Sequence, residues 1–152
     1  MVAAVLAWLL LTLVAPEARA GVAPHVALAL AALLPSAVLL AAMILVQMAV
    51  RGVTGAIDPL DGNDSVFLRT NQRVITNTVE QLAVFVPALL ALAAGAPGAR
   101  MAPIVALAWV FALARLAFWI GYLAGARLRA PGMAATVAVD LATLVCAAWV
   151  WL

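Results

Sequence analysis

The chain has 152 residues, of which 69% are hydrophobic and only 9% are charged. A soluble domain carries about a quarter charged residues, so this composition excludes a water-facing surface and predicts an integral membrane protein. The net charge of +2 comes from arginines scattered along the chain, which excludes the clustered basic face of a nucleic-acid-binding protein.

The first apolar segment, Met1–Val14, has roughly 14 residues and is therefore short for a full membrane span. Ala18-x-Ala20, which follows this segment in the chain, resembles a signal-peptidase site. The positively charged region that begins a secretory signal is missing. Two outcomes are open: cleavage of this segment, or its retention as a short or tilted helix. We favour retention and assign residues 1–24 to an N-terminal hydrophobic helix and its linker, a candidate signal anchor.

Residues 25–152 contain four apolar segments that are each long enough to span a bilayer. The first runs from His25 to the neighbourhood of Arg51, and Pro35 inside it should kink it, which neighbouring helices accommodate in a membrane. Clusters of turn-forming residues separate the segments. The other three segments are Phe67–Leu92, Met101–Leu123 and Met133–Leu152. The predicted fold is an all-α integral membrane bundle of four transmembrane helices, preceded by the additional short N-terminal hydrophobic helix.

The arginines are distributed unequally between the two sets of loops. The connections after the first and third spans hold four of them: Arg51, Arg69, Arg127 and Arg129. The opposite loops hold only Arg19 and Arg100. The positive-inside rule therefore places the Arg51–Arg69 and Arg127–Arg129 connections in the cytoplasm, and we expect a protein of the bacterial inner membrane.

Neither a disulfide nor a metal centre is expected. The one cysteine, Cys146, lies in an apolar segment, and the one histidine, His25, offers no Cys/His cluster for zinc. Asp58, Asp61 and Asp64 share one connection, but they lack the spacing and the terminal glutamate of an EF-hand. A solvated loop is the favoured interpretation.

A polar stripe begins the second span. Its members stand at helical spacing on one side of a helix: Arg69, Arg73, Asn77 and Glu80. Ionisable groups at membrane depth are costly and usually functional. Arg73 and Glu80 are too far apart for a direct pair one turn apart, and Asn77 lies between them. One interpretation is a zwitterionic polar ligand along about 10 Å of the helix. The alternative is a salt-bridge lock between Arg73 and Glu80.

Two more ionisable residues lie inside spans, Arg115 in the third and Asp140 in the fourth. We favour a structural role for both, as a buried pair that locks the bundle. Tyr122 either presents its hydroxyl to a cavity at the cytoplasmic end or belongs to an interfacial aromatic belt. Arg127 and Arg129 are explained by topology or by lipid phosphate, so the residues alone assign them no further role.

Two blocks of these residues resemble the MAPEG family, the membrane-associated proteins of eicosanoid and glutathione metabolism. The first block is Arg73-x-x-x-Asn77-x-x-Glu80 on the second span. The second block is Arg115, then Tyr122, then Arg129-Ala130-Pro131 leading into the last span. The resemblance covers roughly Val26–Leu152, with Arg51 in the same frame at the end of the first span, and suggests a bacterial-type member.

The resemblance implies a four-helix protomer that assembles as a homotrimer, with glutathione bound between subunits near the cytoplasmic side. The residues it assigns to glutathione are Arg51 from the adjacent subunit, Arg73, Asn77, Glu80 and Tyr122. It matches Arg129 to the arginine that stabilises the glutathione thiolate, and so makes Arg129 the candidate catalytic residue. A guanidinium keeps its charge and lowers the pKa of a nearby thiol.

The implied function is a membrane-embedded, glutathione-dependent transferase or peroxidase whose thiolate attacks lipophilic electrophiles from the bilayer. Glutathione would be the co-substrate, and membrane lipids and a lipophilic small molecule would be the other partners. Thr76 and Phe118 depart from residues that some members carry at these positions, which affects the choice of substrate. The alternative is a non-catalytic scaffold or lipid-binding protein that uses the same fold.

Overall fold

The structure, a computed structural model, describes residues 21–58, 60, 62–125 and 127–152. The elements that it describes are α2 (Val22–Ala32), α3 (Leu34–Thr54), α4 (Val66–Gly95), the 3₁₀ turn η1 (Gly98–Arg100), α5 (Met101–Ala124) and α6 (Ala130–Trp151). Within this part of the chain, four helical stretches are long and apolar enough to cross a membrane, the first being α2 and α3 together. The expected all-α membrane bundle is therefore confirmed. The expected helix in Met1–Val14, and the choice between its cleavage and retention, lie outside the described residues.

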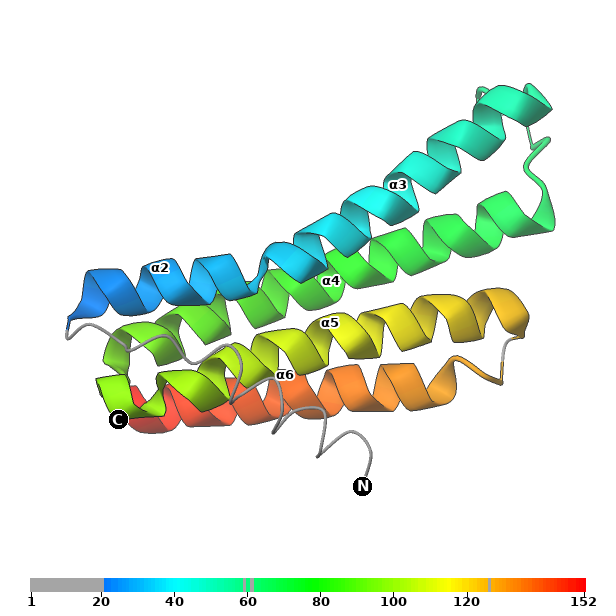
Figure 1. Cartoon of the computed structure of the whole chain (residues 1–152). Coiled ribbons are helices and arrows are strands. Elements are labelled where there is room, and N and C mark those ends of the chain that lie inside the picture. Colours follow the sequence, from blue (N-terminus) through cyan, green and yellow to red (C-terminus); the bar gives the residue numbers. More distant parts are fainter. Residues whose placement is uncertain (1–20, 59, 61, 126) are drawn as a thin grey trace.

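The first span is broken where Pro35 was expected to kink it. α2 ends at Ala32, Leu33 lies between the helices, and Pro35 occupies the first turn of α3. A proline ring lacks the N–H donor and clashes with the carbonyl four residues earlier, so a helix cannot continue regularly through it. Figure 1 shows the result, because α3 leaves the direction of α2 and tilts away from α5 and α6 toward its C-terminal end.

The other helix ends differ from the predicted boundaries by a few residues. α3 continues past Arg51 to Thr54, where Gly55 ends it in the left-handed conformation with φ of 70°. The Ser65 hydroxyl accepts a hydrogen bond from the Leu68 N–H at 3.2 Å and caps the start of α4. α6 begins at Ala130 instead of Met133, because Pro131 suits the first turn of a helix.

The four spans alternate in direction. The α3–α4 and α5–α6 connections lie at one end of the bundle, while the α4–α5 connection and the C-terminus lie at the other (Figure 1). The two arginine-rich connections are therefore on the same side of the molecule, which we call the loop end.

Apolar side chains fill the interior and also cover the outside. Phe85 and Phe111 stack at the centre of the largest buried cluster, with ring centroids 4.2 Å apart. A smaller cluster around Met43, Val74 and Phe118 lies toward the loop end. Many large apolar side chains are exposed on every span, a surface suited to lipid and not to water.

Close contact between α5 and α6 depends on two glycines. A Cβ atom on Gly132 would lie 2.4 Å from the backbone nitrogen of Phe118, and one on Gly121 would lie 2.3 Å from the Leu128 carbonyl oxygen. Only a residue without a side chain fits at either position, as is common where membrane helices pack closely. This contact fixes how the α5–α6 turn approaches the end of α5.

Candidate functional site

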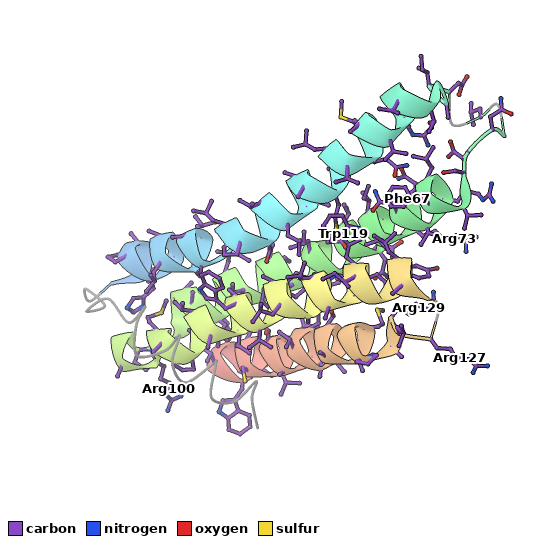
Figure 2. The ribbon with its side chains drawn as sticks, turned by 45° about the vertical axis from the view of Figure 1, so that its right-hand side comes forward. Phe67, Arg73, Arg100, Trp119, Arg127 and Arg129 are labelled. Carbon is purple, nitrogen blue, oxygen red and sulfur yellow. The ribbon has the colours of Figure 1, made fainter. Side chains whose placement is uncertain are left out.

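A cavity of about 320 Å³ opens at the loop end between α4, α5 and the start of α6. The residues that line it are Arg73, Asn77, Phe118, Tyr122, Arg129 and Met133. Four of these are predicted site residues, and they come from both sequence blocks. Figure 2 shows Arg73 and Arg129 at this same end, with Arg100 at the opposite end of the bundle.

Arg129 is held over the cavity by an aromatic ring. Its guanidinium carbon lies 4.6 Å from the centroid of the Tyr122 ring, within the range of a cation–π interaction. Gly121 makes this possible, because the turn backbone at Leu128 passes directly over it. Tyr122 therefore lies in the cavity wall.

The guanidinium of Arg73 and that of Arg129 have no ion-pair partner among the described residues. Both side chains are exposed at the cavity. Two unpaired cations beside one small cavity favour a ligand with negative charge.

Asn77 connects the cavity to the interior. Its Oδ1 accepts a hydrogen bond from Arg115 Nη2 at 3.1 Å, and its Nδ2 donates to Glu80 Oε2 at 3.4 Å. We expected Asn77 to lie between Arg73 and Glu80. In the structure it joins Glu80 to Arg115, and no ion pair between Arg73 and Glu80 occurs in the described chain. Glu80 lies one step outside the cavity lining, on the exposed side of α4.

Arg115 is the largest fully buried side chain of the described residues. Besides Asn77, its Nη2 donates to the Thr78 hydroxyl at 2.8 Å, and the Phe118 ring lies 4.2 Å from its guanidinium carbon. Asp140 is also buried, but none of its oxygens lies within 4.0 Å of an Arg115 nitrogen. The expected direct pair is thus replaced by contacts of Arg115 with α4.

Arg51 does not line the cavity of its own chain. Its guanidinium makes two hydrogen bonds to the Asp64 carboxylate, at 2.9 and 2.8 Å, and a third to the Ala56 carbonyl. These contacts tie the end of α3 to the α3–α4 connection. Arg69 donates to the Asp64 carbonyl at the start of α4 and likewise lies outside the cavity lining.

Sequence reasoning missed a buried amide network near the site. Asn71 Nδ2 donates to Gln47 Oε1 at 2.9 Å and to the Met43 carbonyl, while Asn71 Oδ1 accepts from Trp119 Nε1 at 2.7 Å. The network joins α3, α4 and α5, so it fixes the helices that carry the cavity walls. Its signal was available: Gln47 is a lone amide in an apolar span, and lone polar residues there usually find partners on neighbouring helices.

In the comparison with known families, the model of the MAPEG family matches residues 23–149. Comparison with curated proteins gives no match. The matched range includes every described helix apart from the first residue of α2 and the last two of α6.

Proposed function

This chain belongs to the MAPEG family, and from that premise we propose that it is a glutathione-dependent transferase or peroxidase that acts on lipophilic electrophiles from the bilayer. Family membership and four membrane-spanning helices make it an integral membrane protein related to glutathione and eicosanoid metabolism. One observation carries the more specific proposal. Residues from two separate blocks, Arg73 and Asn77 in one and Tyr122 and Arg129 in the other, line the same cavity.

The chemistry of the cavity suits glutathione. The tripeptide carries two carboxylates, an ammonium group and two amides. Arg73 supplies a cation for a carboxylate and Asn77 supplies an amide, while Glu80, one step outside the lining, supplies a carboxylate for the ammonium group. Charge-assisted contacts of this kind are stronger than neutral ones, so a small number of them can hold a polar ligand at a membrane edge.

We place the reacting sulfur beside Arg129. A guanidinium stays protonated and favours the thiolate over the thiol, so the thiol proton leaves to solvent at neutral pH. The thiolate sulfur then bonds to an electrophilic carbon of the second substrate, whose leaving group departs with the bonding electrons. With an aryl chloride, a C–S bond forms, the C–Cl bond breaks and chloride is released. Tyr122 keeps Arg129 in place through its ring.

We further propose that the protein is a homotrimer in which Arg51 serves the cavity of a neighbouring subunit. Two observations support this arrangement. Arg51 lies outside the cavity of its own chain, and the cavity is not enclosed. In such a trimer the Arg51 guanidinium would either leave Asp64 for a ligand carboxylate or bind both carboxylates at once.

The test is glutathione binding and turnover by purified protein. We expect calorimetry to detect binding at millimolar glutathione, and conjugation of an activated aryl chloride to depend on glutathione in a saturable way. Glu80→Ala should weaken binding by about tenfold, the effect of one lost charge-assisted contact, and Arg129→Ala should abolish most of the turnover. Arg127→Ala, an exposed arginine in the same turn, is the matched control and should change neither.

Absence of binding heat at millimolar glutathione would refute the proposal. Binding without turnover would favour the non-catalytic alternative.

A further inference from the structure

The strongest unexplained feature of the interior is a pair of opposite charges that do not touch. Arg115 on α5 is 0% exposed and Asp140 on α6 is 5% exposed. Arg115 Nε, Arg115 Nη1 and Asp140 Oδ1 have no hydrogen-bond partner among the described residues. Unpaired buried charges are costly inside a protein and more so inside a membrane, so their arrangement calls for a role.

Arg115 and Asp140 lie on two helices that pack closely against each other. α5 and α6 run in opposite directions (Figure 1), and helical side chains tilt toward the N-terminus of their own helix. Gly132 lies against Ala114 and Phe118, and Asp140 lies about 12 Å further along α6. The guanidinium of Arg115 contacts Asn77, Thr78 and the Phe118 ring, and Asp140 lies on the neighbouring helix toward the N-terminal half of α5.

The polar neighbours of Asp140 on the same face of α6 are uncharged. Thr136 and Thr143, its neighbours on that face, donate their hydroxyls to carbonyls of their own helix, Gly132 O and Val139 O. Among the described residues, Asp140 is the one buried carboxylate and Arg115 the one buried guanidinium. The unpaired atoms are complementary, with two donor nitrogens on Arg115 and one acceptor oxygen on Asp140.

Arg115 is linked to the cavity through Asn77. Its Nη2 donates to Asn77 Oδ1, and this bond determines which way the Asn77 amide faces. With the oxygen toward Arg115, the Asn77 nitrogen faces Glu80 as a donor. Asn77 itself lines the cavity. A hydrogen-bonded series thus runs from Arg115 on α5 to Asn77 and Glu80 on α4, and Asp140 on α6 lies beyond its buried end without a hydrogen bond to it.

We propose that Asp140 is a positioning residue for the thiol site: its charge holds the Arg115 guanidinium, and Arg115 in turn fixes the orientation of the Asn77 amide in the cavity. Without the Asp140 charge, Glu80 becomes the nearest carboxylate along this series, and Arg115 shifts toward it. Asn77 then loses its acceptor bond and its fixed orientation. The consequence for ligand binding rests on the proposed function, whereas the coupling of Asp140 to Asn77 does not.

The test is a double-mutant cycle with two measurements. The variants are Asp140→Asn, Asn77→Ala and the two combined, and the matched control is Thr143→Val on the same face of α6. Glutathione affinity is measured by calorimetry, and the midpoint of thermal unfolding is measured in detergent. We expect Asp140→Asn to weaken glutathione binding about three- to tenfold, to have no further effect in the Asn77→Ala background, and to show non-additive unfolding midpoints. Thr143→Val should leave glutathione affinity unchanged.

A purely structural role gives a different pattern. Asp140→Asn would then lower the unfolding midpoint equally in both backgrounds and leave the affinity of the folded protein unchanged, which would overturn the proposal. If the wild type binds no glutathione, the proposed function fails, but non-additive midpoints would still support the coupling and additive midpoints would still refute it.

Removal of both charges together provides a second route if Asp140→Asn does not fold. Replacing a buried pair with apolar residues is often tolerated, so Arg115→Met combined with Asp140→Leu should fold. We expect it to bind glutathione as weakly as Asn77→Ala does. Wild-type affinity in this variant would contradict the proposal.

Discussion

Arg129 combines two properties that rarely occur together in a surface arginine. It is exposed at a cavity, yet the Tyr122 ring restrains its position at 4.6 Å. An arginine that served only to orient the chain in the membrane would need the charge but not the ring. The restraint reduces the entropy lost when the guanidinium meets a ligand, and thereby favours the assignment of Arg129 to the thiolate.

Changes at Arg129 should alter the pH dependence of conjugation. In the proposed mechanism the guanidinium stabilises the thiolate, so its removal should raise the apparent pKa of bound glutathione. Arg129→Ala should therefore shift the rise in kcat/KM to higher pH by on the order of one unit, while Arg129→Lys, which keeps the charge, should shift it less. The measurement is the rate of aryl chloride conjugation across pH, with Arg127→Ala as the control. An unchanged profile in Arg129→Ala would remove this residue from the chemistry.

At this scale the sequence predicted which residues meet but not what each one touches. Arg73, Asn77 and Tyr122 meet at one cavity because helical spacing and alternating spans determine their side and their depth. The partner of Arg51 could not be predicted in the same way, because it depends on how a connection of irregular structure folds back to present Asp64. The partner of Asn77 depends on the rotamer of a long side chain from another helix.

The α5–α6 pair is the element that constructs the site. Gly121 and Gly132 allow the two helices to approach so closely that the turn lies on the end of α5, and this brings Arg129 and Met133 to the cavity wall. A wider separation of α5 and α6 would place Arg129 away from Tyr122. The site therefore depends on backbone contacts that carry no functional group.

Gly132→Ala tests that dependence. The added Cβ would lie 2.4 Å from the Phe118 nitrogen and 2.6 Å from its Cα, and backbone atoms cannot move aside as a flexible side chain can. We expect a loss of about 1–3 kcal/mol in unfolding free energy, together with weaker glutathione binding. Gly52→Ala is the control, because a Cβ there meets nothing within 4 Å and a helical Gly→Ala change is neutral or stabilising by up to about 1 kcal/mol. Denaturation in detergent measures the stability of the two variants, and calorimetry measures their glutathione binding. Equal stability of the two variants would show that the α5–α6 contact is not tight.

Helix number followed directly from composition, whereas helix ends did not. Each span was recognisable because its length and hydropathy exceed what a bilayer requires, and this holds whichever side of the helix faces lipid. The ends depend on local chemistry of a few residues, such as Pro131 in the first turn of α6 and Gly55 after α3. For the same reason the break at Leu33 was predictable only as a kink near Pro35.

For the whole molecule, the two ends of the bundle differ in character. The loop end carries the cavity with Arg73 and Arg129, while Arg100 lies at the other end (Figure 2). From this asymmetry and the positive-inside rule we propose that the cavity faces the cytoplasm. That placement matters for the proposed function, because thiols are kept reduced in the cytosol and become oxidised outside it.

Cysteine labelling can determine the orientation. With the native thiol removed as Cys146→Ser, the variant Leu128→Cys places one thiol in the α5–α6 turn, and Ala99→Cys places one in the α4–α5 connection; both positions are exposed, and both variants keep every arginine. In right-side-out vesicles, a membrane-impermeant maleimide should label Ala99→Cys at once and Leu128→Cys only after permeabilisation. The reverse pattern would place the cavity outside the cell, where reduced glutathione is scarce, and would argue against a glutathione-dependent enzyme even if the purified protein binds the tripeptide.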